Sequence, residues 1–231
     1  MFPSPVYILC IEVAQSVTSL AVSKNGECIS IREVLETNKA ADKIHLLTAE
    51  VLSAVGLSFN DLHAVAISSG PGSYTGLRIA ASAAKGYCFA LDIPLIAVPT
   101  LPAMTVGIQN RYQQTAFDVF VPMIDARREE VYTSFYNSGL DCIQEFSSLV
   151  LDAASIHLFP PDKTYLLFGS GAAKSNKHVE AGHIHVFDEF VPSAKDICQL
   201  AYSGFTARKF EDTAYFEPNY AKAFYTTQQN K

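Results

Sequence analysis

The stretch His63-Ala-Val-Ala-Ile-Ser-Ser-Gly-Pro-Gly-Ser-Tyr-Thr-Gly-Leu-Arg78 decides the fold of this chain. Its first residues, 63–67, are mostly small or β-branched and predict a short strand. The glycine-rich loop Gly70–Gly76 follows, and Ser73 or Thr75 within it can cap the next helix. We expect that helix to run from Leu77 to about Leu91. A strand that passes through such a loop into a helix is typical of an α/β protein.

The residues before this stretch predict three antiparallel strands and one amphipathic helix. Asn25-Gly26 lies between the second and third strands, and this pair favours a tight hairpin turn. In the helix, apolar residues recur at helical spacing and Gly56 can end it. The expected strands are Val6–Val13, Thr18–Ser23 and Glu27–Leu35, and the expected helix is Asp42–Val55.

The second half of the chain follows a similar plan, with antiparallel strands before a strand that enters a glycine-bearing loop. We therefore expect an α/β fold of two lobes, each a mixed sheet with helices. The expected lobes are residues 1–103 and 104–231, with a flexible tail from about residue 218. The remaining expected elements are strands at Pro94–Val98, Val119–Ile124, Glu129–Tyr136, Ile143–Val150 and Tyr165–Phe168, and helices from about Thr100 and over Ala194–Lys209.

Composition and charge exclude several classes of protein. Of the 231 residues, 49% are hydrophobic and 17% are charged, which supports a buried core and excludes a disordered chain. The net charge of −6 argues against a protein that holds nucleic acid by itself, although not against a subunit of a larger assembly. The five cysteines are widely spaced with no CxxC pair, which indicates reduced thiols. Residues 1–14 have neither a basic signal-peptide region nor the length of a membrane span, so we expect a soluble cytoplasmic protein.

Two glycine-bearing loops are candidates for binding a nucleotide phosphate. Glycines let a phosphate approach the backbone, and amides at a helix N-terminus favour an anion. Neither loop has the Gly-Lys-Ser/Thr of a Walker A loop or a GxGxxG fingerprint, so ordinary strand-to-helix turns remain the alternative. Lys174, at the end of the second loop, can reach a phosphate. The candidates, with ATP or ADP as ligand, are Gly70, Gly72, Ser73, Thr75, Gly169 and Gly171.

The helix after the first loop is rich in alanine and glycine, which lets another helix approach it closely. That neighbour is either the expected helix Asp42–Val55 or a helix of a partner protein. We predict that these two helices form a partner interface. Its expected residues are His45, Leu47, Leu52, Leu77, Ala80, Ala81, Ala84 and Cys88.

No pattern for a catalytic or metal-binding residue is present in the sequence. There is no HExxH and no GxSxG motif, and no local Cys/His pairing. His183 and His185 alternate along a strand, but no acidic residue or cysteine completes a metal set at ligand spacing. If the chain were an enzyme acting alone, Glu12 or Asp125 would be the acid in its cleft.

Four segments resemble the TsaB family, in the order in which that family has them. They are Gly70–Arg78, Asp125–Tyr132, Gly169–Ala172 and Pro218–Lys222. The resemblance implies a two-lobed actin-like/sugar-kinase-like (ASKHA) fold. It also implies a bacterial subunit of the system that makes threonylcarbamoyladenosine in tRNA, at the adenosine following the anticodon. In that system TsaD transfers the threonylcarbamoyl group, TsaB is its non-catalytic paralogue and binds it through the N-terminal lobe, and the ATPase TsaE joins them.

Two departures from the catalytic relative favour a non-catalytic subunit. The segment Val98–Met104 has no histidine where that relative carries a metal-binding HxxxH. Glu12-Val13-Ala14 replaces the Asp-Thr-Ser that usually ends the first strand of the family. The resemblance therefore implies no cofactor, no metal, and contact with tRNA only through the complex. A homodimer of the isolated chain stays open, and the alternative function is a stand-alone ASKHA-type kinase or acyltransferase on a small molecule.

Overall fold

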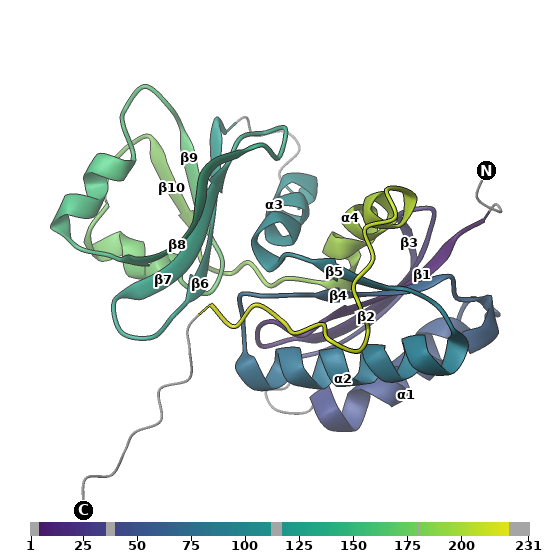
Figure 1. Ribbon diagram of the computed structural model, residues 1–231. Helices are drawn as coiled ribbons and strands as arrows, with labels where there is room; N and C mark the ends of the chain where they lie inside the picture. The colour runs from purple at the N-terminus through teal and green to yellow at the C-terminus, as the bar shows by residue number, and fades with distance from the viewer. Residues whose placement is uncertain (1–4, 36–39, 112–116, 180, 222–231) are drawn as a thin grey trace, which may run out of the picture.

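The computed structural model describes residues 5–35, 40–111, 117–179 and 181–221, and contains two five-stranded mixed sheets (Figure 1). The first sheet has the strand order β3-β2-β1-β4-β5 and the second has the order β10-β9-β6-β7-β8. In each sheet the first three strands along the chain pair antiparallel and the last two continue parallel to the first. Both halves therefore share one topology, which confirms the predicted similarity of plan and the α/β class.

The elements lie close to the expected ranges. Asn25 and Gly26 both have positive φ at the predicted hairpin turn. The strands are β1 (Tyr7–Glu12), β2 (Thr18–Lys24), β3 (Glu27–Val34), β4 (Ala64–Ser68), β5 (Leu95–Val98), β6 (Val119–Asp125), β7 (Glu130–Tyr136), β8 (Cys142–Val150), β9 (Tyr165–Phe168) and β10 (Ile184–Phe187). The helices are α1 (Ala40–Ser53), α2 (Tyr74–Leu91), α3 (Thr100–Arg111) and α4 (Ala194–Thr206), with short 3-10 helices η1 (Phe59–Asp61), η2 (Ala153–Leu158) and η3 (Ala172–Lys177).

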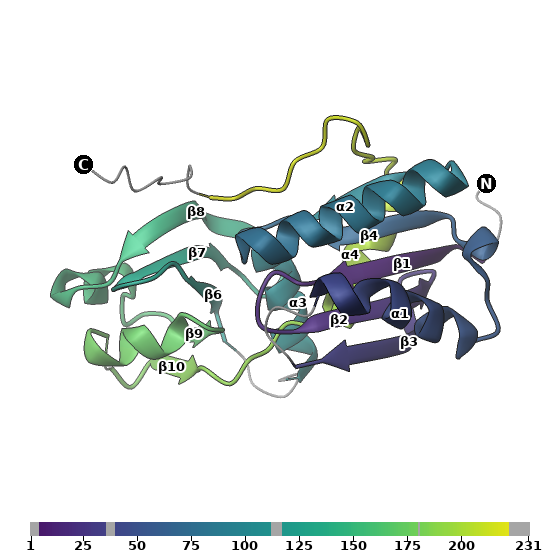
Figure 2. The ribbon, with the colours of Figure 1, turned by 90° about the horizontal axis from the view of Figure 1, so that it is seen from below.

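The first sheet is apolar on both faces and is covered on both. In β1, Leu9 and Ile11 point to the face that α1 and α2 cover. Ile8 and Cys10 point to the opposite face, under α4. Successive side chains of a strand alternate between faces, so one short strand contributes to two cores. Figure 2 shows α1 and α2 side by side across the first of these faces.

The expected lobe 104–231 needs a correction at its C-terminal end. Helix α4 packs against β1, β2, β3 and β5 of the first sheet, with Ile197 and Ala201 in the same buried cluster as Ile8. Glu211 then bridges to Leu95 at the edge of that sheet. The second face of the first sheet needs an apolar cover, and α4 supplies it. Residues 222–231, the larger part of the expected tail, lie outside the described residues.

The second sheet is sandwiched in a similar way. Helix α3 places Leu101, Met104 and Ile108 against one face. The other face packs around Phe159, whose ring stacks on Phe135 with 5.6 Å between centroids. Among the described residues no helix is long and apolar enough to cross a membrane. All five cysteines are free thiols, as the sequence predicted.

The two halves meet where α3 crosses α4. Arg111 at the end of α3 lies 3.7 Å from the buried carboxylate of Asp196 and donates a hydrogen bond of 3.1 Å to the carbonyl oxygen of Val191. Its guanidinium also lies 4.5 Å from the ring centroid of Phe190. A Cβ added at Gly107 would lie 2.5 Å from the Asp196 carboxyl carbon, so the helices approach as closely as glycine allows.

Two helical glycines offer a matched test of this crossing. Gly107→Ala should lower the free energy of unfolding by about 1–3 kcal/mol, because the new methyl group meets the carboxylate that Arg111 holds. Gly86→Ala should raise it by about 0.5–1 kcal/mol, because a Cβ at Gly86 meets no atom within 4 Å and alanine favours the helix. Urea unfolding of both variants measures the difference. Equal effects at the two positions would contradict the close crossing of α3 and α4.

Candidate functional site

The start of α2 is held by Ser73, one of the two capping residues that the sequence allowed. The Ser73 hydroxyl accepts a hydrogen bond of 3.3 Å from the Gly76 amide, and Thr75 lies in the first helical turn. Ser73 and Thr75 also border a pocket of about 300 Å³ beside the β1–β2 turn, together with Gln15 and Ser16. Of the two predicted candidates, Ser73 is therefore the cap.

The glycines of the first loop let the chain's own backbone approach closely. A Cβ at Gly72 would collide with the Ala14 carbonyl oxygen, and a Cβ at Gly70, where φ is +101°, would collide with that of Asn219. The Ser73 amide donates a hydrogen bond of 2.7 Å to the Ala14 carbonyl oxygen. The side of the loop that we expected to face a phosphate at Gly70 and Gly72 thus meets the β1–β2 turn and the C-terminal segment.

The second glycine loop is closed in the same manner. Gly169 has a φ of +102°, and a Cβ there would lie 2.7 Å from the Met123 carbonyl oxygen. The Gly171 amide donates to that same oxygen over 2.9 Å. Lys174 donates hydrogen bonds to the Asp125 carboxylate at 2.6 Å and to the Glu130 carbonyl oxygen at 2.9 Å. Its ammonium group is thereby tied to the β6–β7 turn.

The two acids considered for an enzymatic cleft lie in different surroundings. Glu12 is fully buried at the end of β1, and its carboxylate accepts a hydrogen bond of 2.6 Å from the Ala14 amide. Burial raises the pKa of Glu12 to about 7, against the opposing effect of that hydrogen bond. Asp125 is exposed and forms an ion pair with Lys174. One of the two carboxyl groups is thus buried at the end of β1, and the other is paired with a lysine at the surface.

The two histidines considered as a metal pair, His183 and His185, contact a backbone carbonyl and an aromatic ring instead. His183 Nε2 lies 2.8 Å from the Phe159 carbonyl oxygen, and the His185 ring lies edge-on to Phe117 at 5.3 Å. Within the described ranges, no group of three or more His, Cys, Asp or Glu side chains is arranged to hold a metal ion.

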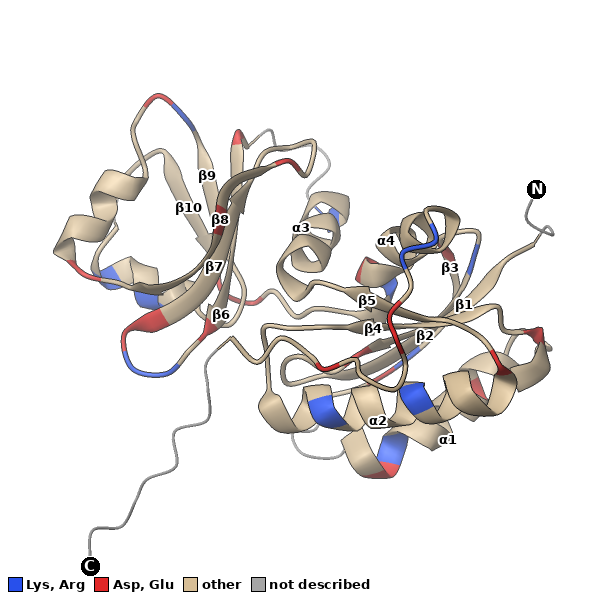
Figure 3. Ribbon diagram, viewed as in Figure 1, with Lys and Arg blue, Asp and Glu red and all other residues tan. Residues whose placement is uncertain are grey.

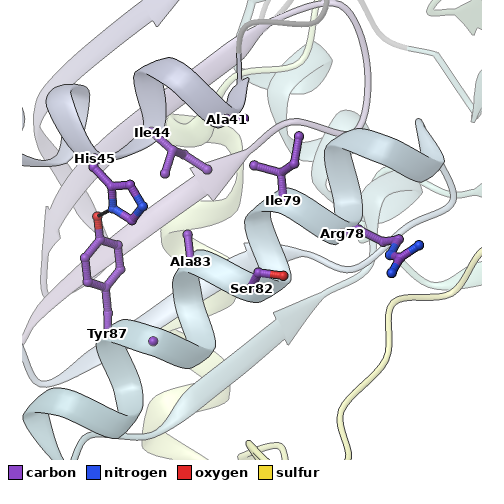
Figure 4. Close-up of a pocket in the computed structure, with 9 residues that line it drawn as sticks. Ala41, Ile44, His45, Arg78, Ile79, Ser82, Ala83 and Tyr87 are labelled. Carbon is purple, nitrogen blue, oxygen red and sulfur yellow. Dashed lines mark hydrogen bonds between the residues drawn. The ribbon is translucent and has the colours of Figure 1, made fainter.

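A shallow groove of about 600 Å³ lies between α1 and α2 (Figure 4). The ring of His45 from α1 meets Tyr87 from α2 at one end, with His45 Nδ1 2.6 Å from the Tyr87 hydroxyl. The small size of the lining residues Ser82 and Gly86 leaves the groove open between the helices. The other lining residues are Ala41, Ile44, Arg78, Ile79 and Ala83.

The predicted interface residues need a correction. Only His45 is exposed; the other seven lie in the chain's own core, where α1 and α2 pack on the first sheet and on each other. Six of these seven belong to the core cluster between the first sheet, α1 and α2, and Leu77 is also fully buried; the six are Leu47, Leu52, Ala80, Ala81, Ala84 and Cys88. Their spacing along the helices is that of a buried stripe, and the same spacing cannot also face a partner.

The outward face of the two helices carries the residues that the sequence analysis missed. Phe89 is 90% exposed and Leu46 is 52% exposed, and both lie on the sides of α2 and α1 away from the sheet. Ser82 and Gly86 are also exposed. The sequence did contain a signal for them, because they fall between the apolar positions whose helical spacing marks the buried side of each helix. Phe89 follows the groove residue Gly86 by three positions on α2, so the two share a side of the helix. A large exposed apolar side chain at such a place indicates a surface that another molecule covers.

Glu12 makes stability depend on pH. The Glu12 carboxyl ionises near its ordinary pKa of 4.5 in the unfolded chain and near 7 in the folded one, so its contribution to stability falls as pH rises between these values. Glu12→Gln should leave an amide oxygen for Ala14 and remove this loss. Above pH 7 we expect the free energy of unfolding of the variant to be higher than that of the parent by up to about 3 kcal/mol.

Denaturant unfolding from pH 4 to 8 measures this effect as the difference between the two stability curves. The difference should grow in favour of Glu12→Gln from pH 4.5 to 7 and then level off. Parallel curves over the whole range would contradict the raised pKa of Glu12.

Comparison with known proteins yields one family model and several similar proteins. The model described as TsaD, tRNA N6-adenosine threonylcarbamoyltransferase, matches residues 37–228. The tRNA threonylcarbamoyladenosine biosynthesis protein TsaB of Escherichia coli is 28% identical over 221 residues, covering 93% of this chain and 94% of that protein. The TsaB proteins of Buchnera aphidicola and Haemophilus influenzae are 35% and 33% identical. Those alignments cover 63% and 55% of this chain, and 65% and 52% of those relatives.

The fold agrees with these matches. The crystal structure of YeaZ from Pseudomonas aeruginosa superposes with a TM-score of 0.79 at 21% identity, covering 92% of this chain and 98% of that chain. This confirms the predicted two-lobed α/β fold of the ASKHA type. Because the TsaD model matches more than half of the residues, and because the similar proteins named above are TsaB proteins, the chain belongs to the TsaB family of tRNA threonylcarbamoyladenosine biosynthesis proteins, within the group that the TsaD model describes.

Proposed function

We propose that this chain is a non-catalytic subunit that binds and activates the transferase TsaD. The α1–α2 groove and its exposed rim would meet equivalent helices of that catalytic relative. The assembly, joined by the ATPase TsaE in the cytoplasm, would add the threonylcarbamoyl group to the adenosine that follows the anticodon. The observation that carries this proposal is the exposed face of α2 formed by Ser82, Gly86 and Phe89, which recur at helical spacing.

The chemistry of this face suits a helical partner. Small residues on α2 let a second backbone come close, and the exposed Phe89 ring offers a large apolar surface to bury at the rim. The Tyr87 hydroxyl lies within hydrogen-bond distance of His45 Nδ1 and donates a hydrogen bond to Thr48. These contacts fix one end of the groove in the absence of a partner. Such preorganisation reduces the entropy lost on association.

The non-catalytic role is supported by the surroundings of the acids. Burial raises the pKa of Glu12 and leaves its carboxyl group almost no contact with water, so it is a poor partner for a nucleotide–magnesium complex. The charge of Asp125 is compensated by Lys174. In both loops, the space beside the glycines is filled by other atoms of the same chain.

Ser82→Arg tests the interface. The new side chain places a charge in the middle of the groove, and burying it without a counter-ion should weaken TsaD binding roughly thirtyfold or more, about 2 kcal/mol. Titration calorimetry with purified TsaD, together with co-purification, measures the loss.

Ser203→Arg is the matched control, because Ser203 is an exposed serine on α4, which covers the opposite face of the first sheet. It should bind TsaD as the parent does. Equal affinities for all three proteins would remove the groove from the interface. Ala84→Arg is not suitable for this purpose, since Ala84 is fully buried and the substitution would disrupt the fold itself.

Calorimetry of the isolated chain with ATP and magnesium separates the proposal from a stand-alone kinase or acyltransferase. We expect no micromolar binding and no release of ADP, because the loops and acids are engaged as described. Micromolar binding accompanied by turnover would favour the enzyme and overturn the non-catalytic role.

A further inference from the structure

The hairpin turn between β6 and β7 carries two adjacent arginines in a backbone conformation that arginine rarely adopts. Arg127 has a φ of 72° and Arg128 has a φ of 51°. The turn closes through a hydrogen bond from the Glu130 amide to the Arg127 carbonyl oxygen. Positive φ is easily adopted by glycine and asparagine and is unfavourable for a residue with a long side chain. Asparagine or glycine would therefore adopt this backbone conformation at a lower energy than arginine at both positions.

The side chains of the two arginines make no polar contact among the described residues. Both side chains are exposed, and within the part of the chain that the structure describes neither forms an ion pair or a side-chain hydrogen bond. The nearby acids already have other cations. Asp125 pairs with Lys174, and Glu129 lies 3.4 Å from Lys177. The two positive charges at the tip of the turn are thus uncompensated, although the chain as a whole carries a net charge of −6.

From this turn we propose a binding site for RNA phosphates, in which Arg127 and Arg128 contact the backbone of the tRNA. A guanidinium group is a planar donor that matches the oxygens of a phosphate, and it is permanently charged. Figure 3 shows the turn as a blue tip that extends to the side of the molecule where α1 and α2 lie. The inference rests on the proposed function, since it takes the tRNA substrate from there. It adds a direct contact by this chain to the expectation that tRNA is met only through the complex.

The double variant Arg127→Asn/Arg128→Gly gives two readouts of opposite sign. It should raise Tm by about 2–4 °C, because asparagine and glycine adopt the positive φ of the turn with less strain than arginine. It should weaken binding of an unmodified tRNA transcript by the complex of this chain with TsaD by roughly tenfold. The slope of log affinity against log salt concentration should also become shallower by about 1.5, as expected for the loss of two phosphate contacts.

Two further variants isolate the cause. Arg127→Gln/Arg128→Gln removes the same charges while keeping long side chains, and it should lose the same tRNA affinity without the rise in Tm. Lys163→Asn/Lys209→Asn removes two exposed cations outside the turn and should change tRNA affinity less than threefold. An equal loss in this lysine variant would show a general charge effect and overturn the site.

The outcomes also separate this inference from the proposed function. If the parent chain binds TsaD and the complex binds tRNA, unchanged tRNA affinity and salt slope in both arginine variants overturn the phosphate site alone. If the arginine variants lose TsaD instead of tRNA, the turn contacts an acidic protein surface and the inference fails. If the parent chain does not bind TsaD, the proposed function fails first.

Discussion

The groove depends on the close approach of the β1–β2 turn to the glycine-rich loop. The Ser73 amide reaches the Ala14 carbonyl oxygen over 2.7 Å, and the space beside Gly76 is taken by the Val13 carbonyl oxygen. This approach fixes the first turn of α2 relative to the end of β1. Since α2 is a rigid rod from that point onward, its position against α1 is determined by the same contact. A larger residue at Gly72 or Gly76 would move the helix and the groove with it.

Helix α2 has small residues both on its buried side and on its exposed side. Its inner alanines, including Ala80 and Ala84, bring it close to the sheet and to α1. Its outer Ser82 and Gly86 leave the groove open. Small residues on both sides make the helix thin, and a thin helix can be covered by the fold on one side and by a partner on the other. The exposed Phe89 then adds the apolar area that such a contact needs.

Charge in the second lobe is arranged locally around the β6–β7 turn. Lys174 and Lys177 of η3 pair with Asp125 and Glu129 at the base of the turn, so among the described residues Arg127 and Arg128 keep no acidic partner at its tip. Net charge therefore says little about this part of the surface. A chain can be acidic as a whole and still present a small cationic site, because screening in salt limits each charge to a range of about 10 Å.

The sequence alone determined the order of most strands and helices, the shared plan of the two halves and the hairpin at Asn25-Gly26, and it limited the cap of α2 to Ser73 or Thr75. These features follow from local periodicity and from the conformational limits of single residues. It did not decide which surface covers a buried stripe. Leu77 and Ala84 are fully buried by the chain itself. Helix α4 follows the second sheet in the sequence but packs on the first sheet. Only the tertiary structure decided these points, because apolar spacing records that a face is buried and is the same whether the cover comes from the chain or from a partner.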